Sequence, residues 1–204
     1  MSWKVKDSAN SEIPRRDTPW CTAEMKAQWQ DDILPRYATK HGALMPILHE
    51  LQHAYRHVSL QAMVEVAAFL ELPPAEVLDT DSYYEEFTVE PVGKCLIGIC
   101  QSIACEVCGH AALEDRIRTK LDLEPHETDD EGRFTLLPLE CLGSCDTAPV
   151  ALFNDELLEN LTMDQLETVL DQVKDIPIEQ LDRARVRDIV RAQGTTQHGR
   201  SPIS

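Results

Sequence analysis

The sequence is poor in basic residues and has no long hydrophobic run. Lys and Arg number 19 against 36 Asp and Glu, so the 204-residue chain carries a formal net charge of −17 at pH 7. Nucleic acid and anionic lipid both require a basic footprint, which argues against either as a partner. No stretch approaches the roughly 18 consecutive apolar residues of a membrane-spanning helix, so we expect no direct membrane insertion.

Two further signals are missing. The sequence from Met1 to Asp7 has no apolar core of the signal-peptide kind, so we expect the chain to be soluble and to stay in the compartment in which it is made. The eight glycines never form the G-x-G-x-x-G fingerprint of dinucleotide-binding turns. We therefore expect any dinucleotide to reside on another chain.

Cysteine, in contrast, is abundant and unevenly placed. The chain is 43% hydrophobic and long enough to bury a core, so it does not need disulfides to fold. An odd number of thiols in a chain that is not exported also weakens a disulfide framework. Six of the seven cysteines fall within 95–145, which points to metal or redox chemistry; the seven are Cys21, Cys95, Cys100, Cys105, Cys108, Cys141 and Cys145.

Composition and periodicity divide the chain into four segments. Residues 1–21 are polar and predict a disordered arm. Residues 22–90 place apolar side chains at helical spacing and predict a helical bundle. Residues 91–175 predict a domain that mixes strands and helices. Residues 176–204 predict a charged helical stretch and a flexible tail.

N-cap residues and prolines delimit four helices in the helical segment. Thr22 and Ser59 are suitable N-caps for the first and third helices. Pro35 should kink or terminate the first helix near its end, and Pro74 can start a short fourth helix. Apolar residues at helical spacing, Val64 among them, should face the interior.

The second half alternates β-prone runs with helical periodicity. The expected strands cover residues 95–100, 134–139 and 150–153. One helix is expected along residues 107–121, and Thr162 opens another with a capping-box sequence. The order strand, helix, strand, strand, helix predicts a small α/β sandwich.

The spacing of the cysteines favours two pairs, Cys100-x4-Cys105 and Cys141-x3-Cys145. A 2Fe–2S cluster takes two thiolates on each iron, and two short loops that present a pair each can supply them. Cys100 and Cys105 lie between a strand end and a helix start. Gly143, inside the second pair, permits the positive φ of a compact loop.

Three other uses of the same thiols remain open on spacing alone. A plant-type ferredoxin pattern would take Cys100, Cys105, Cys108 and Cys141, and would leave Cys145 idle. A tetrahedral zinc site would pair Cys105 and Cys108 with Cys141 and Cys145. A dithiol would use Cys105 and Cys108 alone.

His49-Glu-Leu-Gln-His53 fits the H-E-x-x-H pattern of zinc proteases. The apolar stripe of the same helix puts both histidines on the opposite face, and a catalytic zinc needs a third ligand and a sheltered cleft. We therefore interpret the motif as a solvated polar face.

The chain resembles the thioredoxin-like 2Fe–2S subunit family of NADH:quinone oxidoreductase, respiratory complex I. The resemblance covers about residues 25–175. It rests on motifs in order along the chain: Ile33-Leu-Pro-Arg-Tyr37, Ala43-Leu-Met-Pro-Ile-Leu48 with Gln52, Leu72-Pro-Pro-Ala-Glu-Val77, Tyr83-Tyr84 before Phe87, Cys100-x4-Cys105 with Gly109, Gly132-Arg-Phe-Thr-Leu136, Glu140-Cys-Leu-Gly-Ser-Cys145, Ala148-Pro149 and Asn154-Asp155 followed by Leu161-Thr162.

The resemblance implies an α+β fold, a helical bundle followed by a thioredoxin-like 2Fe–2S ferredoxin domain. Carried over, the family's ligands are Cys100, Cys105, Cys141 and Cys145. The implied role is that of an electron-transfer subunit of the NADH dehydrogenase complex. It would accept an electron from reduced FMN on a partner flavoprotein that also binds NADH, and would have no catalytic pocket of its own.

The same resemblance extends to modules of NAD-linked hydrogenases and formate dehydrogenases. It implies a cytoplasmic location, peripheral to the membrane through the complex, rather than the mitochondrial matrix, since no transit peptide is evident. A structural zinc-binding interaction module is the alternative from another class.

The sequence departs from the family pattern in two places. Residues 78–82 are acidic where relatives usually carry small apolar residues, which bears on docking. Cys95 and Cys108 are additional thiols near the proposed ligands, so they leave room for other ligation. Ala148-Pro149 follows the second pair where thioredoxin-like folds often hold a cis proline, and the sequence leaves its isomer open.

Overall fold

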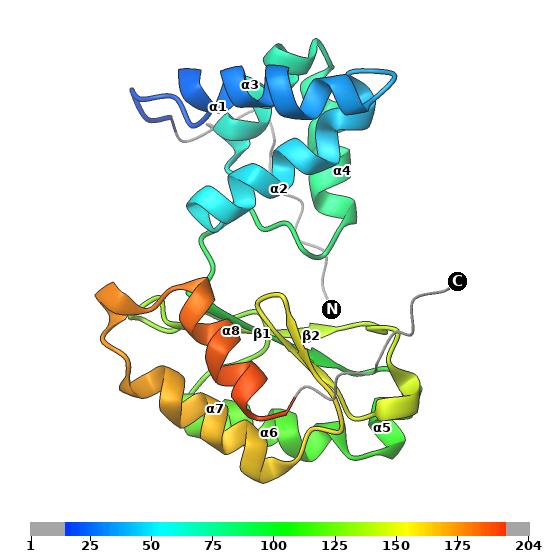
Figure 1. The fold of residues 1–204 in the computed structure, drawn as a ribbon, viewed down its shortest axis with the longest axis vertical. Helices are drawn as coiled ribbons and strands as arrows, with labels where there is room; N and C mark the ends of the chain where they lie inside the picture. The colour runs from blue at the N-terminus through cyan, green and yellow to red at the C-terminus, as the bar shows by residue number, and fades with distance from the viewer. Residues whose placement is uncertain (1–14, 195–204) are drawn as a thin grey trace, which may run out of the picture. The chain divides into compact units, whose positions relative to one another are not determined.

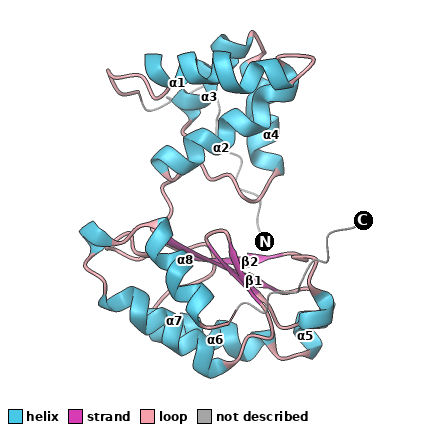
Figure 2. Ribbon diagram, in the orientation of Figure 1, coloured by secondary structure: helices cyan, strands magenta, loops and turns pink. Residues whose placement is uncertain are grey.

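The computed structural model describes residues 15–194, which form two compact units with the boundary between Pro91 and Val92. The first unit is helical, and the second contains the β-strands (Figures 1 and 2). The expected α+β class is confirmed. Residues 1–14 of the predicted arm and residues 195–204 of the predicted tail lie outside the described part. Within the described residues, no helix is long and apolar enough to cross a membrane.

The described part of the helical unit contains four α-helices, as predicted. They are α1 (Ala23–Gln28), α2 (Leu44–Tyr55), α3 (Leu60–Leu70) and α4 (Pro74–Tyr83). Thr22 caps α1 and Ser59 caps α3 through their side-chain oxygens, which accept backbone N–H bonds. Their apolar faces meet in one core that includes Trp29 and Leu48. Val64, which we expected inside, is 37% exposed.

The chain after α1 winds differently from the helix predicted there. Trp29–Ile33 forms a π-helical turn and Leu34–Arg36 a 3₁₀ turn. The N–H of Leu34 bonds to the carbonyl of Trp29, five residues back. Pro35 has no N–H to continue the α-helical ladder and its ring crowds the preceding turn, so the helix loosens and ends here.

The described end of the predicted arm is ordered rather than disordered. The guanidinium of Arg16 lies 3.5 Å from the centre of the Trp20 ring. Gln61 accepts a bond from the Arg16 backbone N–H and donates one back to its carbonyl. Cys21 is buried in the helical core. A cation–π contact and paired backbone bonds thus fix residues 15–21 on the bundle.

The second unit is built on a four-stranded sheet in the order β2-β1-β3-β4. The strands are β1 (Cys95–Cys100), β2 (Phe134–Leu139), β3 (Ala151–Phe153) and β4 (Glu156–Leu158). β1 and β2 are parallel, whereas β3 and β4 are antiparallel to their neighbours. The first two strands have the predicted bounds, and β3 begins one residue later than expected. We did not predict β4, which follows β3 after Asn154 in the left-handed region.

The described part of the second unit also contains four α-helices. They are α5 (Ile103–Val107), α6 (His110–Leu121), α7 (Met163–Asp175) and α8 (Arg183–Ala192). The predicted single helix along 107–121 was wrong at its start, because Gly109 has φ +86° and separates α5 from α6. Val107, the first residue of the expected helix, instead lies in α5 and is exposed. The capping box of Thr162 and Gln165 at α7 is confirmed.

One face of the sheet and three helices enclose the core of this unit. Ile97 of β1 and Phe134 of β2 lie in it with Ile117 of α6 and Leu170 of α7. Val190 of α8 is fully buried in the same core. The charged stretch expected after residue 175 therefore belongs to the packed unit, because its few apolar residues share one helix face.

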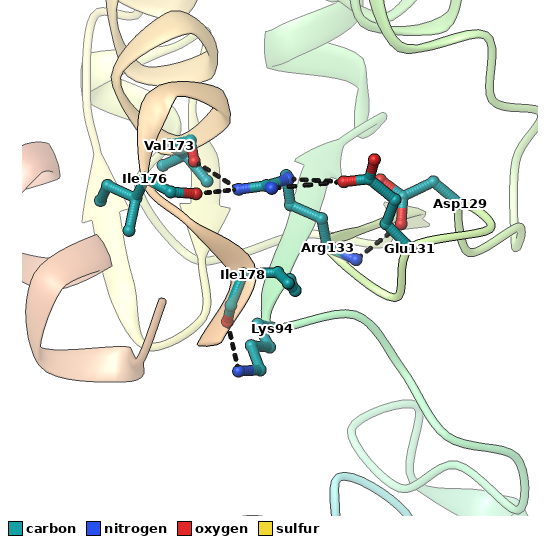
Figure 3. Close-up of polar contacts among 7 residues, drawn as sticks. All are labelled: Lys94, Asp129, Glu131, Arg133, Val173, Ile176 and Ile178. Atoms are coloured by element: carbon teal, nitrogen blue, oxygen red, sulfur yellow. Dashed lines mark hydrogen bonds and ion pairs between the residues drawn. The ribbon is translucent and has the colours of Figure 1, made fainter. Parts of the chain in front are cut away.

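A buried arginine ties α7 to the sheet. The Arg133 guanidinium donates to the carbonyls of Val173 (3.1 Å) and Ile176 (2.5 Å) and pairs with Glu131 (Figure 3). Nearby, Lys94 donates to the carbonyl of Ile178 at 2.6 Å. These bonds add side-chain donors to carbonyls at and just beyond the end of α7, where the regular α-helical ladder has stopped.

Candidate functional site

Two of the proposed thiols lie at the end of β1. Cys100 is the last residue of the strand, and Cys105 lies within α5, which begins after Ser102. Both are almost fully buried, with Cys100 2% and Cys105 1% exposed. They pack against Val150 in a small cluster distinct from the main core. The fold thus holds this pair under cover.

The other two thiols lie in the loop that follows β2. Cys141 and Cys145 are exposed, and their sulfur atoms are 3.5 Å apart. The N–H of Gly143 points to the Cys141 sulfur at 3.4 Å. Gly143 has φ +79°, and a Cβ there would meet nothing within 4 Å, so backbone conformation rather than space requires glycine.

Sheet topology brings the two loops together. In the parallel pair β1 and β2, Cys100 is the register partner of Leu139. Both strands therefore end at the same edge of the sheet, and the loops that follow them begin there. The 3₁₀ turn Cys145–Thr147 contacts α5 (Figure 1). The Ser102 hydroxyl also interacts with the Cys141 sulfur. The Ala148–Pro149 bond beyond the loop is cis.

The four thiols influence one another electrostatically. Burial, together with the nearby Cys100 and Cys145, raises the pKa of Cys105 to about 11, although a backbone bond from Val150 opposes this. The hydrogen bond and negative charge of Cys141 raise the pKa of Cys145. Backbone N–H donation from Gly143, with bonds from Cys145 and Ser102, lowers the pKa of Cys141. Several thiolates at this edge therefore require compensating positive charge.

This donor set fits a 2Fe–2S cluster. Soft thiolates are the ligands that such clusters take, and each iron needs one pair. The iron ions would supply the positive charge that compensates the negative thiolates at this edge. Between residues 15 and 194, no three His, Cys, Asp or Glu side chains are grouped around a single point as ligands of one metal ion. The arrangement is that of two pairs on neighbouring loops.

The remaining cysteines have different surroundings. Cys108 follows the last residue of α5 and is exposed. Cys95 lies in the main core, apart from the small cluster that holds Cys100. Cys21 is in the other unit, and burial raises its pKa to about 12. Of these three, Cys108 alone is both exposed and next to an element that carries a proposed ligand.

The histidines of the H-E-x-x-H motif lie on α2, as predicted. His49 is half-buried and His53 is exposed, with 6.0 Å between the centres of their rings. The Nε2 atom of His49 is 3.3 Å from a carboxylate oxygen of Glu86, and its ring packs beside Phe87. The motif therefore forms a polar surface with an aromatic neighbour.

Sequence reasoning missed two contributors to the site. Ser102 and Val150 act on ligand sulfurs from positions that the cysteine spacing does not mark. For Ser102, the only signal in the sequence was its place between Cys100 and Cys105. Val150 was assigned only as a strand residue, and its place beside the thiols depends on the pairing of β1 with β3.

Comparison with known proteins places these features in context. The profile of the family described as thioredoxin-like 2Fe-2S ferredoxin matches residues 30–174. A subunit of NADH-quinone oxidoreductase from Rhizobium meliloti (strain 1021) is 32% identical over 139 residues, which cover 68% of this chain and 83% of that protein. An NADH-quinone oxidoreductase subunit from Mycobacterium tuberculosis (strain ATCC 25618 / H37Rv) is 31% identical over 161 residues, covering 79% of this chain and 64% of that protein.

Solved structures give a related result. The NAD+-reducing NiFe-hydrogenase in its H2-reduced state matches with a TM-score of 0.60 and 26% identity over 71% of this chain. The air-oxidised state of an NAD+-reducing NiFe-hydrogenase matches with a TM-score of 0.58 and 25% identity over 67% of this chain. In both, the match spans 24% of the hydrogenase chain, about a quarter of its length.

Proposed function

This chain belongs to the thioredoxin-like 2Fe-2S ferredoxin family, and from that premise we propose that it is the electron-transfer subunit of an NADH:quinone oxidoreductase. It carries one 2Fe–2S cluster, held by Cys100, Cys105, Cys141 and Cys145. It accepts an electron from reduced FMN on a partner flavoprotein subunit. The observation that carries the proposal is the meeting of two cysteine pairs at one edge of the sheet.

The residues of the site have distinct tasks in this function. When bound, the cluster supplies one-electron redox chemistry. Cys100 and Cys105 hold the inner side, where burial excludes water from the sulfurs. The N–H of Gly143 donates to the Cys141 sulfur and stabilises its negative charge. Cys141 and Cys145 lie on the exposed side, through which electrons enter.

The partner supplies the rest of the reaction. We assign NADH and FMN to the flavoprotein; the absence of a dinucleotide fingerprint from this sequence supports the assignment for NADH. The relatives are named as subunits of NADH-quinone oxidoreductase, an oxidoreductase complex. We place this chain in the same kind of assembly, on its cytoplasmic side and peripheral to the membrane.

A second assembly has its own support. The solved structures that resemble this chain are NAD+-reducing NiFe-hydrogenases, in which the matched part is about a quarter of a longer chain. The same module therefore also fits a subunit of an NAD-linked hydrogenase. The overall reaction separates the two assignments: NADH is oxidised and quinone reduced in one, whereas H2 is oxidised and NAD+ reduced in the other.

Spectroscopy of the anaerobically purified full chain tests the function. We expect two irons and two acid-labile sulfides per chain, visible absorption that bleaches on dithionite addition, and a rhombic S = 1/2 EPR signal on reduction. With the co-expressed flavoprotein subunit, NADH should bleach the same absorption. A colourless protein with one zinc per chain would overturn the proposal in favour of a zinc-binding interaction module.

A further inference from the structure

Helix α5 presents an apolar face to solvent immediately beside the proposed cluster. Ile103 and Val107 are each 82% exposed, the highest exposure among the large hydrophobic side chains in the described residues. They are four residues apart and so lie on the same side of the helix. A helix this short gains nothing in stability from two solvated β-branched residues, which makes a covering partner the physical explanation.

The same helix links this apolar face to the site. Cys105 lies two residues from both Ile103 and Val107, which places it on the opposite side of α5, where it is buried. An α-helix with side chains is about 10–12 Å across, so a protein packed on Ile103 and Val107 comes within about that distance of the Cys105 sulfur. The contact of α5 with the turn Cys145–Thr147 makes the exposed thiols part of the same surface.

Charge around this surface indicates the chemistry of the partner. Segments 100–109 and 140–148 contain three acidic residues, Glu106, Glu140 and Asp146, and no Lys or Arg. All three acidic side chains are exposed. A surface with an apolar centre and an acidic rim is complementary to an apolar recess flanked by Lys and Arg.

We propose that Ile103 and Val107 are the docking contact for the flavoprotein subunit that reduces this chain. The inference rests on the proposed function and names the surface through which it operates. The flavoprotein packs an apolar recess with a basic margin onto α5, which holds its flavin on the side of the chain that carries Cys141 and Cys145. The interaction weakens as salt rises, because the rim is acidic.

The test uses full-length chain loaded with its cluster and the co-expressed flavoprotein subunit. The variant Ile103→Asp/Val107→Gln removes the apolar contact and adds one negative charge. Its control, Thr119→Asp, adds the same charge to an exposed position of α6. We expect the Kd for the flavoprotein to rise by about tenfold or more in the first variant and to change little in the second.

Further readouts separate docking from cluster assembly. Dithionite should reduce the docking variant as completely as the wild type, with an unchanged EPR signal, whereas reduction by NADH through the flavoprotein should slow. The conservative variant Ile103→Leu/Val107→Ile should bind and be reduced like the wild type. Wild-type binding should weaken as NaCl is raised from about 50 mM to about 500 mM, where charges on the rim are screened.

Several results would overturn the docking surface. An unchanged Kd in Ile103→Asp/Val107→Gln would do so, as would loss of the cluster signal in that variant, since the effect would then lie in assembly. If the wild type were a dimer and the variant a monomer that still binds the flavoprotein, the face would instead be the contact with a second copy of this chain. If the wild-type chain, purified without any partner, held no cluster, the proposed function itself would be overturned. This measurement is independent of the docking test.

Discussion

Within the described residues, each of the two units buries one Asp or Arg side chain, and the two are treated in opposite ways. Arg133 in the sheet unit is 8% exposed and Asp81 in the helical unit is 3% exposed. Arg133 donates to two backbone carbonyls and pairs with Glu131 (Figure 3). The Oδ1 atom of Asp81 has no hydrogen-bond partner among the described residues.

The contrast shows which buried polar side chain stabilises its unit and which one destabilises it. Removing a partner from a buried, hydrogen-bonded charge is strongly destabilising. A carboxylate removed from water favours its neutral form, and burial raises the pKa of Asp81 to about 6. The sheet unit is therefore reinforced around the frame that carries the site, whereas the helical unit carries a destabilising group within α4.

The largest expected difference between the units concerns their cysteines. Cys145→Ser, in the sheet unit, should abolish the 2Fe–2S cluster, because serine is a poor ligand for iron at this site and the second iron loses one of its pair. Cys21→Ser, in the helical unit, should leave it intact. Iron content and the EPR signal of anaerobically purified protein measure both effects.

Cys108→Ser is the matched test within the sheet unit. It should keep the cluster, since Cys108 is not one of the four proposed ligands. An intact cluster in Cys145→Ser together with its loss in Cys108→Ser would contradict the two-pair assignment and favour the plant-type set.

The next largest effect should follow from Arg133→Met. The variant removes the Arg133 donor from the Val173 and Ile176 carbonyls and leaves Val173 only a long bond from the Ile176 N–H, so the sheet unit should lose about 2–4 kcal/mol of its free energy of unfolding. Urea unfolding followed by far-UV circular dichroism measures it. Tryptophan fluorescence is the internal control, because Trp3, Trp20 and Trp29 all precede the boundary between the units. An equal shift in the fluorescence transition would show that the units unfold together.

The comparison also explains what the sequence could predict. The runs 95–100 and 134–139 are β-prone and bounded by polar residues, so both strands were predicted with their true bounds. The cysteine spacing indicated two pairs because it depends only on local sequence. β4 has three residues, too few for a period of two to be recognised, and its existence depends on pairing with β3.

The backbone conformation of single residues and the burial of side chains by distant parts of the chain were harder to predict. The helix at 107–121 was extended across Gly109, because a glycine within a helical pattern does not by itself reveal a positive φ. The burial of Asp81 has no local signal, since an acidic residue in α4 suggests a solvated face. Likewise, spacing could not tell that Cys100 and Cys105 are covered whereas Cys141 and Cys145 are exposed.

Asp81→Asn should stabilise the helical unit by about 1–3 kcal/mol at pH 8, because it removes the cost of ionising a buried carboxylate. The folded-state pKa of about 6 lies above the ordinary value of 3.8, so the folded state holds the proton more tightly. Wild-type stability should therefore fall as pH rises from about 4 to about 6 and level off above. The variant should lack this slope in urea unfolding followed by tryptophan fluorescence. A parallel pH profile in both proteins would contradict the assignment to Asp81.

The smallest effect concerns the left-handed residues that end helices. In the sheet unit Asp122 ends α6 at φ +54°, and in the helical unit Glu71 ends α3 at φ +59°. Glu71→Gly should stabilise the helical unit by about 0.5–1 kcal/mol, since glycine removes the Cβ penalty of this conformation at the cost of more chain entropy. The exposed ion pair with Lys40 that it removes contributes little. Glu71→Gln at the same position keeps the strain and loses only the charge. Its free energy of unfolding, measured in urea by tryptophan fluorescence, should therefore equal that of the wild type or lie slightly below it. If both variants were destabilised equally, the ion pair rather than the backbone would determine how α3 ends.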